Sequence, residues 1–465
     1  MTNNLSPFSF VNIKSEVKTS SRLALPLVTS ELVYGINSFI ATVMVSHLGK
    51  AQLAANALSW GIYLVVFLFF LGILSAISIL ISQSFGAKDD AAISICFKQG
   101  FILAILFSIP TTFIMWFSPF ILTLAKQQPE VIALAKPLFH SMAISMLPLN
   151  LLVAMQQLFF GISKPRFTLY MSFVTIPVEI FFYYVLLFGK LGFPKVGLAG
   201  IGYSLAISYT VSALLAWTYL YFSKDTKPYH LFEKWWVANR KFILELLRIG
   251  IPLGFSFCSE LALFATIAMM MGVLGTTTLA AYQIAYQFLM IVYFVIFGFT
   301  QCAMIRAGIE IGKNNRNALK LTVLVNFSIS TAITLLFSVV YFFFPHLIIS
   351  IDIDIHKAEL QSLVKEATKF LAILSLFILT DGFRIMYNGA IRSLKDTKFF
   401  IFASVTGFWI IAFPAAYLFG FAFKWGGSGI WWGLLIGLFV SGIMLFTRFY
   451  YLAKSTDLQA LVTRS

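Results

Sequence analysis

The 465-residue chain has very few charged residues. Asp, Glu, Lys and Arg make up 11% of it, whereas hydrophobic residues make up 60% and the mean hydropathy is +0.90. A soluble domain carries about 25% charged residues, so this composition excludes a soluble globular protein. Apolar stretches of at least the ~20 residues that a membrane helix needs recur along the whole sequence. We therefore predict an all-α membrane protein with twelve transmembrane helices.

Cysteines and the sequence motifs of enzymes are also scarce. The three cysteines, Cys96, Cys258 and Cys302, are widely spaced and give neither a disulfide pattern nor a metal-binding pattern. The sequence contains no Ser-His-Asp arrangement and no G-x-x-x-x-G-K-[ST] loop for nucleotide phosphates. We therefore expect a protein that is not an enzyme, uses no ATP, and needs neither a metal nor another cofactor.

Basic residues outnumber acidic ones, 33 against 18, which gives a formal net charge of +15. The excess lies in alternate loops and in the segment 223–242, as the positive-inside rule predicts when the N-terminus is cytoplasmic. We therefore expect a multi-pass protein of the bacterial inner membrane with both termini in the cytoplasm. The basic groups are expected to contact lipid headgroups, and no nucleic acid is expected as a partner.

Four acidic residues lie inside apolar segments. They are Glu31, Glu179, Glu260 and Asp381. A carboxylate in the middle of a membrane helix costs about 2.5–3.5 kcal/mol on insertion scales, so each needs a proton, a metal ion, a cationic ligand or an internal base. We predict that these four residues are the sites at which a cation or proton couples to the function of the protein.

Structural roles for the same carboxylates are the alternative. Arg384 lies three residues after Asp381 on the same helical face, where the two side chains can form a buried ion pair. That pair is either purely structural, or Arg384 is a counter-ion that an arriving cation or proton must displace. Glu31 and Glu179 each follow a proline and can satisfy polar groups nearby, whereas Glu260 has no basic residue within one helical turn.

The second half of the chain repeats the first. A shift of 226 residues aligns Pro26 with Pro252 and Leu48-Gly49 with Leu274-Gly275. Six spans per repeat preserve the orientation, so we predict two pseudo-symmetric six-helix lobes, an arrangement common in secondary transporters. The predicted boundaries are 1–21 for a cytoplasmic N-terminal segment, 22–222 for the N-lobe, 223–242 for a cytoplasmic linker, 243–453 for the C-lobe and 454–465 for a cytoplasmic tail.

Two further groups of residues are candidates for function. A proline inside a helix removes a hydrogen bond and bends the helix, so Pro26 and Pro252 predict either static kinks or bends that change when a neighbouring carboxylate is protonated. Aromatic and polar side chains can hold flat organic cations in a substrate cavity. The candidates are Tyr34, Asn37, Tyr183, Gln283, Tyr286 and Gln287.

Several short stretches keep a fixed order and spacing across the twelve spans. They are Leu23–Pro26, Leu48-Gly49, Phe188–Gly192, Ala280–Gln283, Ile391–Thr397 and the run from Phe413 to Gly420. Together they resemble the multidrug and toxic compound extrusion (MATE) family of the MOP superfamily, and in particular its NorM-like branch. The resemblance runs from about Arg22 to Arg448 and implies the MATE fold.

The resemblance also implies roles for particular residues. In the NorM-like branch a glutamate in the seventh span and an aspartate in the tenth form a cation-linked site, and Glu260 and Asp381 match those positions. The family often has an aspartate late in the first span, where this sequence has Ala41. We hypothesise that Glu31 and Glu179 rebuild that N-lobe site.

The function implied by the resemblance is secondary antiport. A cation, H⁺ or Na⁺, would drive the export of amphipathic, mostly cationic compounds by alternating access through a monomer, with small organic cations and membrane lipids as partners. The alternative is a flippase for a lipid-linked oligosaccharide from the same superfamily, a class whose cavity carries several basic residues. Four intramembrane acids against one clear base, Arg384, favour a cationic substrate.

Overall fold

The structure is a computed structural model that describes residues 10–233, 235 and 238–463. These residues form helices and connecting turns, with no strand among them. The start of the predicted N-terminal segment, Trp236 of the predicted linker and the last two residues of the predicted tail lie outside the described residues.

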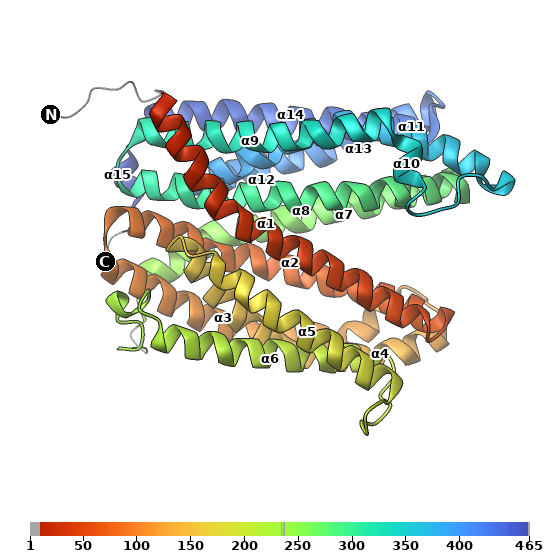
Figure 1. The fold of residues 1–465 in the computed structure, drawn as a ribbon, viewed down its shortest axis with the longest axis horizontal. Coiled ribbons are helices and arrows are strands. Elements are labelled where there is room, and N and C mark those ends of the chain that lie inside the picture. The colour runs from red at the N-terminus through yellow and green to blue at the C-terminus, as the bar shows by residue number, and fades with distance from the viewer. Residues whose placement is uncertain (1–9, 234, 236–237, 464–465) are drawn as a thin grey trace. The chain divides into compact units, whose positions relative to one another are not determined.

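The chain forms a series of long helices joined by short connections (Figure 1). The α-helices before the predicted linker are α1 (Phe10–Ser46), α2 (Lys50–Ala87), α3 (Asp90–Leu124), α4 (Pro129–Gly161), α5 (Arg166–Phe188) and α6 (Ala199–Phe222). After the short 3₁₀ turn η1 (Lys227–Tyr229) come α7 (Arg240–Leu274), α8 (Thr276–Gly312), α9 (Arg316–Phe343), α10 (Pro345–Ile349), the 3₁₀ turn η2 (Ala358–Leu360), α11 (Gln361–Ser393), α12 (Thr397–Val405), the π-helix η3 (Thr406–Ala412), α13 (Phe413–Tyr417), the π-helix η4 (Leu418–Ala422), α14 (Gly426–Ser455) and α15 (Leu458–Leu461).

Twelve of these helical segments are long and apolar enough to cross a membrane. The predicted number of transmembrane helices and the all-α class are therefore confirmed. The eleventh span, Thr397–Ala422, is assembled from α12, η3, α13 and η4. Because π-helical turns inside membrane helices are often found at functional sites, this span is of particular interest.

The internal repeat is visible in the helix boundaries. Gly49 and Gly275 precede α2 and α8 with φ of 129° and 132°, a conformation that glycine adopts readily because it has no Cβ. Asp89 and Asn315 cap α3 and α9, and each side chain accepts a hydrogen bond from a backbone N–H in the first turn of its helix. Both pairs are related by the shift of 226 residues, so the two halves use the same turn chemistry at equivalent places.

The residues group by their contacts into two compact units. Unit 1 takes its described residues from Met1–Val28 and Phe255–Leu461, and unit 2 from Thr29–Gly254 and Val462–Ser465. The divisions fall inside α1 and α7, two residues after Pro26 and Pro252, at positions that the repeat relates. This grouping describes packing, and the lobe boundaries predicted from the sequence stay a prediction.

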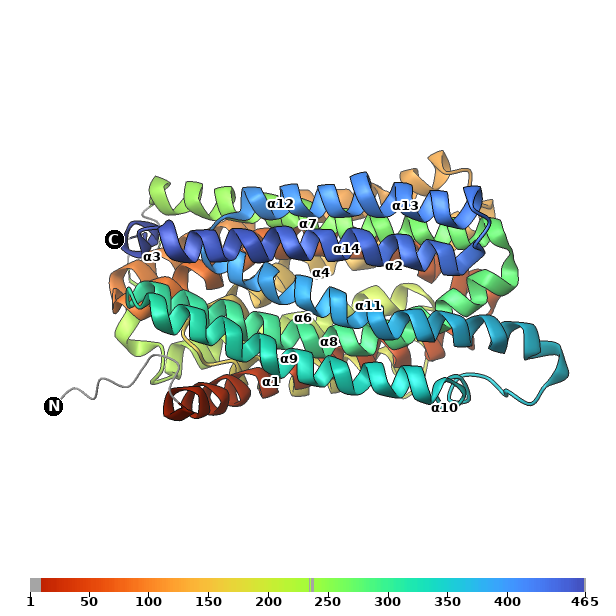
Figure 2. The same cartoon turned by 90° about the horizontal axis from the view of Figure 1, so that it is seen from above.

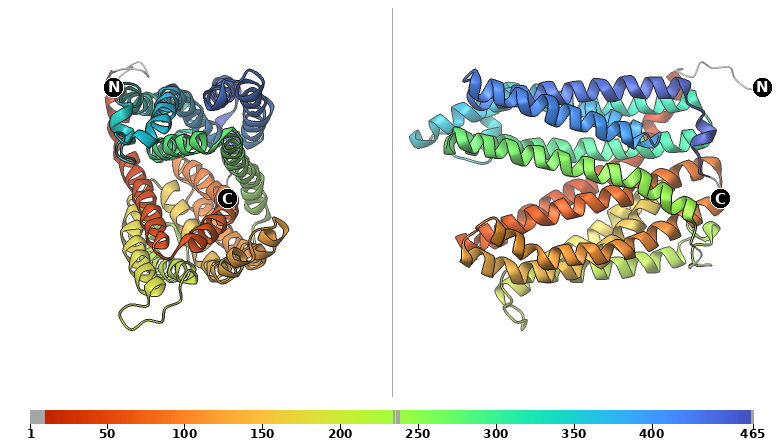
Figure 3. Two further views of the ribbon diagram at one scale, coloured as in Figure 1. Left: turned by 90° about the vertical axis from the view of Figure 1, so that its right-hand side faces the viewer. Right: turned by 180° about the vertical axis from the view of Figure 1, so that it is seen from behind.

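One long helix lies at the centre of each unit. In unit 1, α11 packs against α8, α9 and α14, and Figure 2 shows it running between α9 and α14. In unit 2, α4 packs against α2, α3 and α6, and Figure 3 shows the orange-to-green helices of this unit side by side. The C-terminal half of α11 is therefore surrounded by protein, which is how this helix buries Asp381, Arg384 and Arg392.

Close helix contacts occur at glycines that the repeat relates. A Cβ added to Gly298 of α8 would lie 2.6–2.9 Å from atoms of Val28 in α1, within unit 1. A Cβ added to Gly72 of α2 would lie 2.4 Å from the backbone nitrogen of Gly254 in α7, within unit 2. In both units a glycine thus lets the backbone of a proline-containing helix approach closely, next to the residue where that helix passes from one unit to the other.

Candidate functional site

Three charged side chains meet in the interior of unit 1. Glu260 lies on α7, and Asp381 and Arg384 lie one turn apart on α11. The residues are 9%, 1% and 0% exposed, so all three are buried. We call Glu260, Asp381 and Arg384 the charged triad.

Arg384 joins the two carboxylates of the triad. Its Nε donates to Oδ1 of Asp381 at 2.6 Å, and its Nη2 donates to Oε1 of Glu260 at 2.6 Å. Its Nη1 lies 3.5 Å from Oε2 of Glu260, so the guanidinium group faces both oxygens of that carboxylate. The predicted contact between Asp381 and Arg384 is present. Glu260, which has no base near it in sequence, obtains the same arginine as its partner across 124 positions.

Aromatic side chains surround the triad on two further elements. The hydroxyl of Tyr293, on α8, donates to Oε1 of Glu260 at 3.1 Å. The ring of Phe408, in the π-helix η3, lies 5.1 Å from Cζ of Arg384. The next residue, Trp409, donates from Nε1 to Oγ of Ser259 at 2.9 Å, directly beside Glu260. The π-helical turn of the eleventh span therefore places Phe408 against Arg384 of the triad and Trp409 against the residue that precedes Glu260.

The triad carries one positive and two negative formal charges, so it retains a net charge of −1. Charges buried in protein must be paired, because removing one partner leaves an uncompensated charge and costs about 3–5 kcal/mol. A proton or cation that joins the triad makes it neutral. The triad can therefore bind one proton or one monovalent cation, and the buried group of charges is then neutral.

A second polar cluster lies in unit 2. Glu179 of α5 is 2% exposed, and its Oε1 accepts a hydrogen bond from Nδ2 of Asn37 at 2.7 Å and another from the hydroxyl of Tyr183. Three of the residues predicted from the sequence are thus brought together. Within the described part of the chain, no basic side chain pairs with this carboxylate.

The other predicted site residues lie apart from these clusters. Glu31 is half-buried on α1, and no side chain among the described residues hydrogen-bonds to it or pairs with it. Tyr34 is half-buried one turn after Glu31 on α1. The remaining candidates lie on α8: Tyr286 stacks on Tyr282 with 5.7 Å between the ring centroids, and Gln283 and Gln287 are exposed.

The two prolines lie inside uninterrupted helices. α1 continues through Pro26, which is buried, and α7 continues through Pro252, which is partly exposed. A bend that responds to protonation stays a prediction. Among the described residues no disulfide joins any of the three cysteines, and Cys96 and Cys302 are buried.

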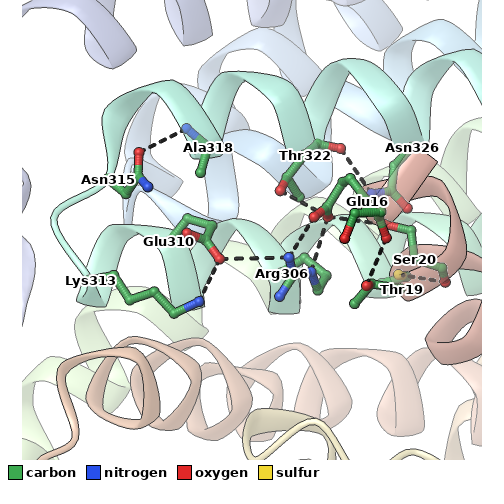
Figure 4. Close-up of polar contacts among 12 residues, drawn as sticks. Glu16, Thr19, Ser20, Arg306, Glu310, Lys313, Asn315, Ala318, Thr322 and Asn326 are labelled. Carbon is green, nitrogen blue, oxygen red and sulfur yellow. Dashed lines mark hydrogen bonds and ion pairs between the residues drawn. The ribbon is translucent and has the colours of Figure 1, made fainter. Parts of the chain in front are cut away.

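Sequence reasoning missed a charged cluster that anchors the first turns of α1 (Figure 4). Arg306 of α8 contacts both carboxylate oxygens of Glu16, with Nε–Oε1 of 3.0 Å and Nη2–Oε2 of 2.6 Å. Thr322 of α9 and Ser20 also donate to Glu16. These contacts hold α1 against α8 and α9 before Arg22, the residue near which the sequence predicts that the first span begins.

The number of buried bases is also larger than the sequence suggested. Arg392, two turns after Arg384 on α11, is 1% exposed and its guanidinium lies over the ring of Phe257 at 5.5 Å. Arg306 is largely buried in its ion pair with Glu16. Counting Arg384 as the one clear base was therefore wrong, because residues near helix ends can be buried by neighbouring helices that hydropathy does not reveal.

Twelve helices long and apolar enough to cross a membrane, an internal repeat and buried charged clusters together define a polytopic membrane protein with the repeated architecture that many transporters have. The MatE family model matches residues 26–185 and again 252–418, once in each half of the chain and beginning at the two equivalent prolines. The chain belongs to the MatE family. The predicted family is therefore confirmed.

Several bacterial proteins of similar length and sequence are all named probable multidrug resistance protein NorM. The probable multidrug resistance protein NorM of Rhizobium meliloti (strain 1021) is 26% identical over 437 residues, which are 94% of each chain. The proteins of the same name from Mesorhizobium japonicum and Bradyrhizobium diazoefficiens are each 29% identical, over 94% and 95% of both chains. The name of these relatives describes multidrug resistance and mentions no enzyme activity.

Solved structures show the same fold. An outward-facing multidrug resistance MATE family transporter of the MOP superfamily superposes with a TM-score of 0.86 at 18% identity, covering 96% of both chains. The eukaryotic MATE transporter AtDTX14 gives a TM-score of 0.83 at 19% identity, covering 97% of this chain and 98% of that one. The predicted MATE fold is therefore confirmed.

Proposed function

We propose that this protein is a secondary antiporter that exports amphipathic, mostly cationic organic compounds in exchange for H⁺ or Na⁺. Its family and the multidrug resistance proteins that resemble it over nearly their whole length support drug export. We place it in the bacterial inner membrane as a monomer with both termini in the cytoplasm, where the basic excess of the sequence supports that orientation. It needs neither ATP nor another cofactor.

The observation that carries the coupling proposal is the charged triad. With both carboxylates ionised, the triad has a net charge of −1 and attracts the positive charge of a substrate. When a coupling cation binds a carboxylate, that attraction is lost and the substrate is released. Loss of the coupling cation on the opposite side of the membrane restores the charge, so binding alternates between the two ligands.

The cluster around Glu179 is proposed as a second cation site in unit 2. Glu179 is buried and receives its hydrogen bonds from the uncharged side chains of Asn37 and Tyr183. A buried carboxylate with only neutral donors is expensive to keep ionised, so a proton or cation is expected to join it. Glu31, on α1, remains a candidate for the same role.

The membrane potential supplies enough energy for this exchange. One elementary charge moving through ~150 mV releases roughly 3.5 kcal/mol, because 100 mV corresponds to about 2.3 kcal/mol. At about 1.4 kcal/mol for each tenfold ratio, one coupled charge sustains a concentration gradient of a few hundred-fold.

The test is transport of ethidium, a fluorescent cation, by the purified full-length chain in proteoliposomes. Dye movement driven by an imposed pH or Na⁺ gradient without ATP supports the antiporter. Liposomes that hold the heat-inactivated protein are the control for leakage. If neither gradient moves the dye, the proposed function is wrong, and the flippase becomes the function to test with a fluorescent lipid-linked oligosaccharide.

A further inference from the structure

The position of Arg384 in the charged triad distinguishes between H⁺ and Na⁺ as the coupling ion. A metal ion that bridges Glu260 and Asp381 needs oxygen atoms of both carboxylates directed at one point. In this structure those oxygens are directed at nitrogen atoms of Arg384, with contacts of 2.6 Å to each carboxylate. The guanidinium group therefore stands where a bridging sodium ion would have to bind.

Arg384 cannot leave this position by losing its proton, because an arginine side chain stays protonated in proteins. It is fully buried, and the ring of Phe408 lies 5.1 Å from its Cζ. A sodium ion would have to separate Arg384 from both carboxylates and leave it buried without a counter-charge, which is strongly unfavourable. Arg384 thus acts as a permanent internal cation in place of an exchangeable metal ion.

A proton can bind to the triad without displacing Arg384. The hydrogen bond from Nε of Arg384 goes to Oδ1 of Asp381, so a proton on Oδ2 of that carboxylate is compatible with this contact. A carboxylic acid still accepts a hydrogen bond through its other oxygen. The triad needs only one positive charge to become neutral, and one proton supplies it without moving the arginine.

The other groups that face the triad are aromatic side chains. α8 contributes Tyr293, which donates to Glu260, and carries Tyr286 two turns before it. Arg392 lies two turns after Arg384 on α11, with its guanidinium over the ring of Phe257. The η3 segment contributes only the uncharged Phe408 and Trp409. Tyrosine hydroxyls and arginines keep their protons at neutral pH, so the carboxylates are the groups that exchange one.

We propose that the ion coupled at the charged triad is a proton, and that Arg384 excludes sodium by occupying the position between the two carboxylates. This inference rests on the proposed antiport function and specifies its driving ion. It also predicts that the selectivity for the proton is lost when the positive charge of Arg384 is removed.

The experiment compares two gradients across the same ethidium-loaded proteoliposomes. A pH gradient in sodium-free buffer is expected to drive transport, and a sodium gradient at equal pH is expected to drive none. If sodium alone drives transport by the wild-type chain, the inference is overturned while the antiport function stands. Transport by neither gradient overturns the antiport function and this inference with it.

Arg384→Gln tests the role of the arginine, because glutamine is uncharged and supplies an amide oxygen. This variant is expected to gain transport or ion binding that responds to sodium. Arg392→Gln is the matched control, because it removes a buried arginine from the same helix without touching the triad, and should leave the ion preference unchanged. If Arg384→Gln folds and stays indifferent to sodium, Arg384 does not exclude it.

A measurement on the wild-type chain keeps the inference testable when Arg384→Gln does not fold. Isothermal titration of detergent-solubilised wild-type protein with sodium chloride, against choline chloride, is expected to show no sodium-specific heat. In weakly buffered solution, ethidium binding is expected to release protons in an amount that depends on pH. Sodium-specific binding heat that is absent in Glu260→Gln would overturn the inference.

Discussion

Replacing Glu260 by glutamine separates the coupling role of the triad from its structural role. The substitution removes one negative charge but retains an amide oxygen that can accept a hydrogen bond from Nη2 of Arg384, where Oε1 now accepts one at 2.6 Å. Hydrogen bonds to charged groups contribute about 1.5–3 kcal/mol each. Asp381 still pairs with Arg384, so the larger cost of a buried charge without a partner is avoided.

We therefore expect Glu260→Gln to destabilise the fold by about 1.5–3 kcal/mol, since one charge-assisted contact is weakened and the other kept. The expected readouts are a thermal unfolding midpoint lowered by a few degrees in detergent and a complete loss of gradient-driven ethidium transport. The charge balance explains the loss: Asp381 and Arg384 alone are neutral, so neither a proton nor a cationic substrate is attracted to the triad.

Glu310→Gln is the matched control for this prediction. Glu310 is also a buried glutamate of unit 1, 4% exposed, and it lies 2.8 Å from Lys313 and 3.6 Å from Arg306. Its neutralisation should leave coupling intact. Gradient-driven efflux at the wild-type rate in Glu260→Gln would refute the role of the triad. Failure of that variant to fold would refute the argument that Asp381 compensates Arg384.

Three further predictions concern stability and positioning. Glu16→Ala leaves Arg306 without its main partner and is expected to cost about 3 kcal/mol, the low end for a buried ion pair, so an unchanged unfolding midpoint in detergent would contradict it. Gly298→Ala overpacks α8 against α1 and should cost about 1–3 kcal/mol, whereas Gly61→Ala, whose Cβ meets no atom within 4 Å, should not lower the same midpoint. Trp409→Phe removes the hydrogen bond to Ser259 of α7 and is expected to slow ethidium efflux, with a change in stability of about 1 kcal/mol. Efflux at the wild-type rate would show that this tryptophan does not position the triad.

Membrane topology could be predicted well from the sequence because the physical signal is local. Each span must satisfy its backbone hydrogen bonds within itself and present apolar side chains to lipid, so each span can be recognised from its hydropathy. The repeat could also be recognised from short stretches of sequence. The same turn chemistry at Gly49 and Gly275, and the same close contacts at Gly72 and Gly298, require glycine at positions 226 residues apart.

The candidate site could be predicted only in part. A carboxylate inside an apolar run is conspicuous, so Glu179, Glu260 and Asp381 were found, and the contact between Asp381 and Arg384 followed from their spacing on one helix. Glu16 was missed because it lies near the start of a helix, where a charged residue is expected to be solvated.

What the sequence alone determined is the set of twelve helices, their repeat and the presence of charges within them. Only the tertiary structure decided which charges meet. It brought Glu260 to an arginine on α11, Asn37 to Glu179 on α5 and Phe408 to the face of Arg384. The physical reason is that helix formation depends on neighbouring residues, whereas the pairing of buried charges depends on which helices pack together and on the rotation of each about its axis.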